Sequence, residues 1–220
     1  MKYKLVIFDL DGTLLDTLDD LSAAVNYAME LWGFPQHTRD EYMEMVGHGA
    51  KNLISKALPV EERNDEDFVP QILEDFRYYY NTNIDVYTQP FPGIPQLLEK
   101  LHQEGVLLAV ASNKFQEGTE HLINEFFPDI PFVAILGNRP GSPLKPDSEV
   151  VGEVLRKAGL SPAEAVMVGD SDTDMETAVN GGIRGIAVTW GYRNMKEWAR
   201  EKQGITLVET AEELQKTLLA

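Results

Sequence analysis

Short apolar runs alternate with helical patterns through most of this chain. Runs rich in Val, Ile, Leu and Ala are typical of buried strands, and they occupy residues 4–8, 107–111, 132–136, 165–168 and 185–188. A shorter run at 206–208 predicts an edge strand. Helical patterns between these runs cover residues 94–101, 150–158 and 175–179. This alternation predicts an α/β fold whose core is a doubly wound, Rossmann-like parallel sheet with helices on both faces.

Residues 17–85 depart from the alternation, because they contain helical patterns and no convincing strand. The first predicted helix carries an apolar stripe on one face, made of Leu18, Leu21, Val25, Ala28 and Trp32. A capping box at Thr38 and Glu41 begins a second helix, a third follows residues 47–49, and a fourth runs to Tyr80. Four helices of this length predict a small bundle.

Helix-end signals support this count of elements. Capping boxes are expected at residues 161–164 and 210–213, each just before a predicted helical turn. We therefore predict two domains. An α/β catalytic core comprises residues 1–16 and 86–220, and a four-helix cap, residues 17–85, is inserted after the first strand.

The charge balance narrows the classes of partner. The 36 acidic and 19 basic residues give a net charge of −17 at pH 7, which repels nucleic-acid phosphates and anionic lipid headgroups. The absence of Cys excludes disulfides and Cys-ligated zinc. The first apolar run is too short for a signal peptide or a membrane span, so we expect a cytoplasmic protein that binds neither nucleic acid nor membranes. The sequence carries no signal for an oligomeric state.

Polar side chains follow several predicted strands at the points where those strands end. The stretches are DLDGT at 9–13, SNK at 112–114, KP at 145–146 and GDSDTD at 169–174. Ligands of an open parallel sheet bind outside the carboxyl ends of its strands, so we expect these side chains to converge. An Asp after a strand is most often a cap or turn residue, but two acidic clusters at one edge repel each other unless a cation is present. With no His pair at zinc-binding spacing, the pattern predicts an oxygen-ligated Mg²⁺ ion.

The order of these motifs resembles that of the haloacid dehalogenase-like phosphohydrolases. The family's four motifs correspond to DxDGTLxD at 9–16, SNK at 112–114, KP at 145–146 and GDSxxD at 169–174, so the resemblance spans nearly the whole chain. Within that superfamily, further stretches are similar to the phosphoglycolate phosphatase group, namely the helical insertion and residues 46–53, 90–93 and 190–192.

The resemblance implies a reaction with two carboxylates. Asp9 would attack the phosphorus atom of a phosphomonoester to form an aspartyl-phosphate, and Asp11 would protonate the leaving alcohol and later activate water. Side chains at i and i+2 of a strand end point the same way, so one carboxylate can reach phosphorus while the other reaches the leaving oxygen. Lys145 would neutralise the charge that grows on the phosphoryl group.

The resemblance also implies the ligands of the ion and of the phosphate. Three groups would hold Mg²⁺: the Asp9 carboxylate, the Asp11 carbonyl and Asp170. Asp174 would bond the waters of the ion or orient Lys145. The phosphate would contact the tight-turn amides of Gly12 and Thr13, the Ser112 hydroxyl and the Asn113 amide.

The charges of this predicted site do not balance. Four negative charges come from Asp9, Asp11, Asp170 and Asp174. Mg²⁺ and Lys145 supply three positive ones. A proton on Asp11 would bring the sum to zero before a phosphate dianion binds, so we predict that substrate binding favours protonated Asp11.

The cap offers weaker candidates. His48, in the turn at residues 47–49, could contact a substrate carboxylate at the start of the third helix, although a plain turn explains the pattern equally well. Asp16 and Thr17 are predicted to cap the first helix. The tyrosines at 78–80 are interpreted as packing residues.

These patterns predict an Mg²⁺-dependent phosphatase for a small phosphomonoester, with 2-phosphoglycolate as the favoured substrate. Sugar phosphates, nucleotides and pyrophosphate remain alternatives, as does a phosphomutase of the β-phosphoglucomutase type. Thr13 and Leu21 argue against the mutase, because mutase-like sequences usually have Val and His there. A signalling receiver resembles a shorter chain without an inserted cap, and a catalytically silent binding protein would lack one of the motif residues.

Overall fold

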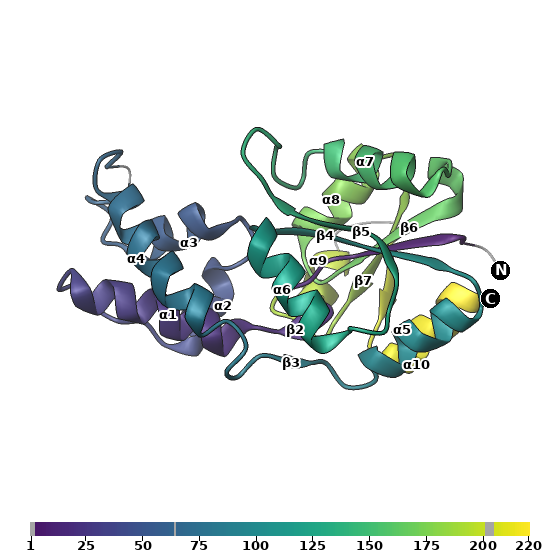
Figure 1. Ribbon diagram of the computed structural model, residues 1–220, viewed down its shortest axis with the longest axis horizontal. Helices are drawn as coiled ribbons and strands as arrows, with labels where there is room; N and C mark the ends of the chain where they lie inside the picture. The colour runs from purple at the N-terminus through teal and green to yellow at the C-terminus, as the bar shows by residue number, and fades with distance from the viewer. Residues whose placement is uncertain (1–2, 64, 201–204) are drawn as a thin grey trace.

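A six-stranded parallel sheet forms the centre of the computed structural model, which describes residues 3–63, 65–200 and 205–220. The strands lie in the order β5-β4-β1-β6-β7-β8 (Figure 1). They are β1 (Leu5–Phe8), β4 (Leu107–Phe115), β5 (Phe132–Asn138), β6 (Ala165–Gly169), β7 (Arg184–Val188) and β8 (Thr206–Val208). The predicted α/β class and each predicted strand are therefore confirmed.

Helices cover both faces of the sheet (Figure 1). They are α5 (Ile94–Gln103), α6 (Gln116–Phe126), α7 (Glu149–Ala158), α8 (Asp172–Asn180), α9 (Met195–Arg200) and α10 (Ala211–Leu219). Successive side chains of a strand point to opposite faces. Ile7 of β1 accordingly packs in one buried cluster with Val151 of α7, and Phe8 packs in another with Leu97 of α5. This explains why the central strand is apolar at every position.

Four further helices lie beside the sheet, at the left of Figure 1. They are α1 (Leu18–Leu31), α2 (Arg39–Met45), α3 (Ala50–Ala57) and α4 (Val69–Thr82). The apolar stripe of α1 is buried as expected, except that Trp32 ends the helix half-buried, with its indole N–H 2.8 Å from Asp75. We call residues 17–85 the cap segment and the rest of the chain the core; the division at these residues stays a prediction.

The cap segment is joined to the core by two connections that run side by side. β2 (Leu15–Asp16) pairs antiparallel with β3 (Gln89–Pro90). Beyond this pair, the buried Asp20 carboxylate accepts hydrogen bonds from the Tyr87 amide and from both the amide and the hydroxyl of Thr88, at 2.8–3.1 Å. One carboxylate thus ties the start of α1 to the returning chain.

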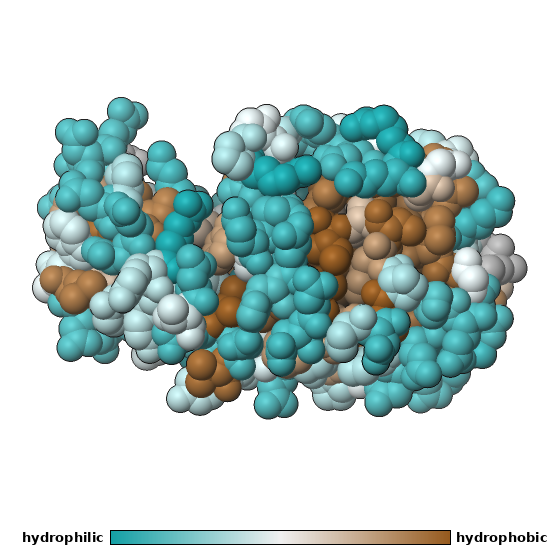
Figure 2. Space-filling model, in the orientation of Figure 1, coloured by the Kyte–Doolittle hydropathy of each residue, from teal (hydrophilic) through white to brown (hydrophobic). Residues whose placement is uncertain are grey.

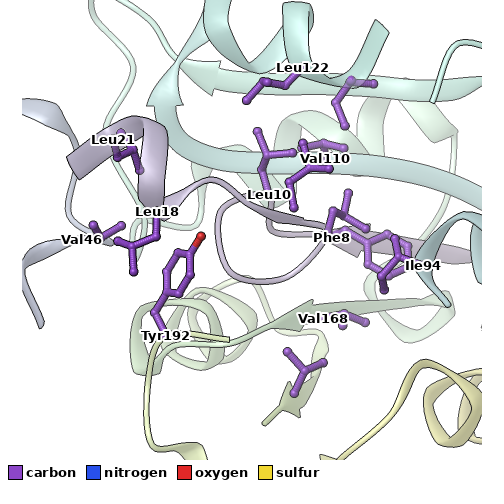
Figure 3. Packing of buried hydrophobic residues seen from close by; sticks show 14 of the residues in the cluster. Phe8, Leu10, Leu18, Leu21, Val46, Ile94, Val110, Leu122, Val168 and Tyr192 are labelled. Carbon is purple, nitrogen blue, oxygen red and sulfur yellow. The ribbon is translucent and has the colours of Figure 1, made fainter. Parts of the chain in front are cut away.

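Apolar packing is continuous from the core into the cap segment. Leu10 and Val110 of the core belong to the same buried cluster as Leu18 and Val46 of the cap segment. Tyr192, in the loop after β7, points its hydroxyl toward the start of α1 and lies near Leu18 (Figure 3). The two parts therefore share one apolar core.

Three features differ from the sequence-based expectation. Helix α6 carries no recognisable start signal, since Phe115 provides no side-chain cap, and the six-residue helix α9, capped by Asn194, is not predicted. The capping box at residues 161–164 is present but closes a single 3₁₀ turn, Pro162–Glu164, because the apolar strand β6 begins immediately afterwards. β4 continues past residue 111 to Phe115, with a shift in its register against β5.

The face drawn in Figure 2 is mostly hydrophilic, with apolar side chains gathered beside α6, where edge strand β5 runs in Figure 1. Phe132, Val133 and Ile135 of that strand are partly exposed. Within the described ranges, none of the helices combines the length and the apolar character needed to cross a membrane.

We expect Asp20→Ala to lower the free energy of unfolding by about 3 kcal/mol, because it leaves the Tyr87 and Thr88 amides without their acceptor. The matched control is Asp19→Ala, which removes an exposed carboxylate paired with Arg39 and should cost less than about 1 kcal/mol. Urea unfolding of the two variants measures both values. Equal losses would show that Asp20 is not a structural tie.

Candidate active site

The strand-end residues meet at one cavity between the core and the cap segment. Asp9 follows β1 and Asp170 follows β6, and these two strands are neighbours at the centre of the sheet. Lys145 enters from the loop after β5. The cap segment supplies an apolar wall that includes Leu53 and Phe76. From β1 the strand order continues through β4 to β5 on one side, and from β6 it continues through β7 to β8 on the other. The cavity thus lies at the point where the strand order reverses, which is where open parallel sheets bind ligands.

Three carboxylates are concentrated in this cavity. Asp9, Asp170 and Asp174 each offer an oxygen within 4.8 Å of the others, and all three residues are buried. Burial raises the pKa of Asp9 well above its ordinary value, with a further rise from Asp174, while Lys145 opposes it. Burial also raises the pKa of Asp170 to about 7, again with a contribution from Asp174. Hard oxygen ligands that repel one another fit a small divalent cation such as Mg²⁺.

Lys145 lies between two of these carboxylates. Its Nζ atom is 2.7 Å from Asp9 Oδ1 and 2.7 Å from Asp174 Oδ1. Burial lowers the pKa of the Lys145 ammonium, but the two carboxylates outweigh burial and hold that pKa above its usual value. The lysine is thus fixed as a cation beside Asp9. Asp174 orients Lys145, which is one of the two roles that the motif resemblance allowed it.

Tight turns hold Asp170 in place. Its Oδ2 atom accepts the Tyr192 amide at 2.7 Å, and its Oδ1 atom accepts the Thr13 hydroxyl at 3.1 Å. Gly12 has φ +89°, and a Cβ there would lie 2.4 Å from the Asp170 carboxylate, so only glycine fits. Gly12 and Thr13 therefore support Asp170 in this structure and do not line the cavity.

The 112–114 motif lies where β4 shifts its register against β5, an irregularity of the kind that re-aims side chains next to active sites. Ser112 and Asn113 both line the cavity. The Asn113 side chain donates to the carbonyls of Gly47 and Lys145 and accepts the Lys145 amide. It therefore fixes the loop that carries Lys145, and it links the core to the cap segment.

The Asp11 carboxylate contacts two side chains that the sequence does not predict as its partners, Thr17 and Lys114. The Thr17 hydroxyl donates to its Oδ1 atom at 2.6 Å, and the Lys114 ammonium lies 3.0 Å from the same oxygen. Thr17 makes no side-chain cap for α1, so the predicted capping role of Thr17 is wrong. Its hydroxyl serves the carboxylate instead.

Lys114 changes the charge balance of the site. With this second buried ammonium beside Asp11, two lysines and an Mg²⁺ ion supply four positive charges against the four carboxylates. The count that predicts a proton on Asp11 omits Lys114, so the summed charge does not require that proton before substrate binds. A phosphate dianion adds two negative charges beside Asp11, so we still expect substrate binding to favour the protonated carboxyl group.

His48 lies outside this cavity, although its neighbours Gly47 and Gly49 line it. His48 lines a neighbouring surface pocket together with Asp172 and Arg193. Partial burial lowers the pKa of His48, and the nearby cations Lys56 and Arg193 lower it further. The structure therefore does not bring His48 to the other site residues.

Three residues of the cavity wall escape sequence reasoning: Tyr80, Lys114 and Arg193. Lys114 is the last residue of the SNK stretch that follows the predicted strand, and only its burial shows that its ammonium needs a partner. Tyr80 does pack as expected, but its buried hydroxyl also needs a partner. Arg193 donates to the carbonyls of Met43 and Val46 at the end of α2, a contact that only the tertiary structure reveals.

The sequence profile of the haloacid dehalogenase-like hydrolases matches residues 6–188, and the chain belongs to this family. It is 32% identical to a phosphoglycolate phosphatase from Aliivibrio fischeri over 87% of this chain and 86% of that protein. It is 33% identical to one from Mesorhizobium japonicum, over 90% and 88% of the two chains. A crystal structure of a protein from Lactobacillus delbrueckii subsp. bulgaricus superposes with a TM-score of 0.90 at 34% identity, covering 99% of each chain.

The family and the cavity together define the class of enzyme. The protein is a phosphoric monoester hydrolase, and within its superfamily it falls in the phosphoglycolate phosphatase-like group. A second solved structure, of a predicted phosphoglycolate phosphatase from Haemophilus somnus 129PT, has a TM-score of 0.88 at 29% identity over 99% of each chain.

We expect Mg²⁺ to raise the Tm of the protein, and to do so more at about pH 7.5 than at about pH 5. Without the ion, the raised pKa values of Asp9 and Asp170 mean that the folded state keeps protons that the unfolded chain releases. The free energy of unfolding therefore falls as the pH rises from about 4 to about 7, and Mg²⁺ replaces those protons. Thermal scans with Mg²⁺ at about 100 times its Kd should show a rise of roughly 5–10 °C.

Asp170→Asn should remove most of this Mg²⁺-dependent rise. Asp172→Asn is the matched control, because Asp172 faces the neighbouring pocket and should leave the rise intact. An equal effect of Mg²⁺ on both variants would place the ion elsewhere.

Proposed function

We propose that the protein is an Mg²⁺-dependent phosphatase that hydrolyses 2-phosphoglycolate through an aspartyl-phosphate on Asp9. The observation that carries the proposal is the buried Lys145 ammonium, 2.7 Å from both Asp9 and Asp174 at the end of the central strand. Phosphoryl transfer needs a positioned nucleophile with positive charge beside it. The relatives from Aliivibrio fischeri and Mesorhizobium japonicum support the choice of substrate.

The first step forms one bond and breaks one. An Asp9 carboxylate oxygen attacks the phosphorus atom of the ester, and the bond between phosphorus and the leaving oxygen breaks. The proton that the leaving oxygen needs comes from Asp11, two residues along the strand end. Lys145 stays protonated and stabilises the negative charge on the phosphoryl oxygens.

The second step releases the enzyme. A water molecule attacks the phosphorus atom of the aspartyl-phosphate and gives its proton to Asp11, and the bond between phosphorus and Asp9 breaks. Inorganic phosphate leaves, and both carboxyl groups return to their starting states. Asp11 thus acts first as an acid and then as a base.

The ion would be held by the side chains of Asp9 and Asp170 and by the carbonyl of Asp11, with Asp174 beside it to bond its waters or orient Lys145. When bound, it supplies positive charge to the phosphoryl oxygens. The cluster of carboxylates supports this choice, since their oxygens lie within 4.8 Å of one another.

The cap segment supports hydrolysis of a small ester. Leu21, Leu53 and Phe76 form an apolar wall opposite the carboxylates. An apolar wall displaces water, which strengthens the electrostatic interactions inside the cavity and protects the aspartyl-phosphate. Ser112 and Asn113 line the floor of the cavity, where we place the phosphate.

We expect Asp9→Asn to reduce kcat by roughly 10⁴-fold or more, because the nucleophile is lost. Release of phosphate from 2-phosphoglycolate measures the loss, and an unchanged urea midpoint shows that the fold is intact. Asp172→Asn, an acid outside the cavity, should keep full activity. Normal turnover by Asp9→Asn would rule out the covalent mechanism.

The substrate is tested with a panel that contains 2-phosphoglycolate, hexose phosphates, nucleoside monophosphates and pyrophosphate, with Mg²⁺ and with excess chelator. We expect 2-phosphoglycolate to have the highest kcat/KM and all activity to vanish with chelator. A faster ester from the panel would replace the proposed substrate. Isomerisation of β-glucose 1-phosphate without phosphate release would establish the mutase instead.

A further inference from the structure

A buried chain of polar groups runs from the cap segment to Asp11. Lys114 leaves the irregular end of β4, and only 2% of its side chain is exposed. Its Nζ atom lies 3.0 Å from Asp11 Oδ1 and 3.1 Å from Asp11 Oδ2, and it donates to the Tyr80 hydroxyl at 2.8 Å. The same ammonium lies 4.8 Å from the centre of the Tyr80 ring. The ammonium therefore has defined partners on both sides.

Thr17 is the second residue that contacts the Asp11 carboxylate. The Thr17 hydroxyl donates to Asp11 Oδ1, while the Thr17 amide donates to the Tyr192 hydroxyl at 2.7 Å. Thr17 supplies a neutral hydrogen bond, whereas Lys114 supplies a full charge that reaches both carboxylate oxygens. Lys114 is therefore the stronger constraint on how the Asp11 carboxylate is turned.

Tyr80 makes this constraint depend on the cap segment. It is fully buried on α4, its ring stacks on Phe76 at 5.3 Å, and it meets Phe115 of the core edge to face at 6.0 Å. A buried tyrosine fixed in this way cannot follow Lys114 if α4 moves from the core. Lys114 would then lose one of the partners that fix its head group.

We propose that Lys114 is a positioning residue for the Asp11 carboxylate. In this proposal, the hydrogen bond to Tyr80 of the cap segment holds the Lys114 ammonium in position. The proposal rests on the proposed function, in which Asp11 gives a proton to the leaving oxygen. Lys114 itself neither gains nor loses a proton. Proton transfer by Asp11 is thereby coupled to the packing of α4 against the core.

The test compares two esters that differ in how much they need the Asp11 proton. An alkyl phosphate such as 2-phosphoglycolate releases a poor leaving group, whereas the p-nitrophenolate of p-nitrophenyl phosphate departs without a proton. We expect Lys114→Met to reduce kcat for 2-phosphoglycolate by roughly 10²-fold, the lower end of what general acid–base catalysis contributes. The loss with p-nitrophenyl phosphate should stay below about tenfold, and KM should change little for either ester.

Lys100→Met is the matched control, since it removes an exposed lysine of α5, and it should leave both rates unchanged. Equal losses of Lys114→Met on the two esters would overturn the proposal, because they would show that Lys114 serves the phosphoryl group or the fold. No loss on either ester would overturn it as well. Lack of phosphate release from both esters by the wild-type protein would instead refute the proposed function.

Tyr80→Phe provides a second variant that keeps the ring and its packing, in case Lys114→Met does not fold. We expect about a fivefold loss of kcat for 2-phosphoglycolate, on the scale of one lost hydrogen bond, and a smaller loss for p-nitrophenyl phosphate. Tyr79→Phe is its control, because the neighbouring Tyr79 stacks on Tyr27 within the cap segment. Equal behaviour of the two tyrosine variants would contradict the link between Tyr80 and Asp11.

Discussion

The confinement of like charges at one sheet edge is the constraint around which this structure is arranged. Asp9, Asp170 and Asp174 are buried together, where their mutual repulsion is poorly screened. Lys145 offsets part of that repulsion through direct contacts with two of them. The repulsion that remains supports the proposal that a divalent ion binds here. The backbone is also packed tightly against Asp170, since Gly12 leaves no room for a side chain there.

The two parts of the chain contribute different things to the cavity. The core contributes every carboxylate and both buried lysines, because the carboxyl ends of its parallel strands meet there. The cap segment contributes apolar surface and the Tyr80 hydroxyl. In the proposed reaction, the chemistry would depend on the core, whereas the cap segment would shape the space for the leaving group. Hydrogen bonds from Arg193 to the end of α2 connect the core to the cap segment.

The strands and their terminal motifs could be predicted from sequence because both follow from local rules: apolar runs form buried strands, and parallel strands present their ends at one edge. The partners of individual side chains could not. Thr17 occupies a cap position yet bonds Asp11, and Lys114 completes a motif yet faces the cap segment. His48 sits in the expected turn but lines another pocket. Each of these outcomes depends on tertiary packing, which a linear pattern does not encode.

The pairing of β2 with β3 has a consequence for how the chain folds. Leu5 of β1 must find Leu107 of β4, far along the chain, and closing such a long loop is entropically slow. The helices of the cap segment also pack on one another, as Ile54 and Ile72 do within the apolar cluster that continues into the core. β2 and β3 bring both ends of the insertion to one place. If this pair forms early, the loop that remains to be closed between β1 and β4 is short, and the insertion then aids the pairing of the central strands.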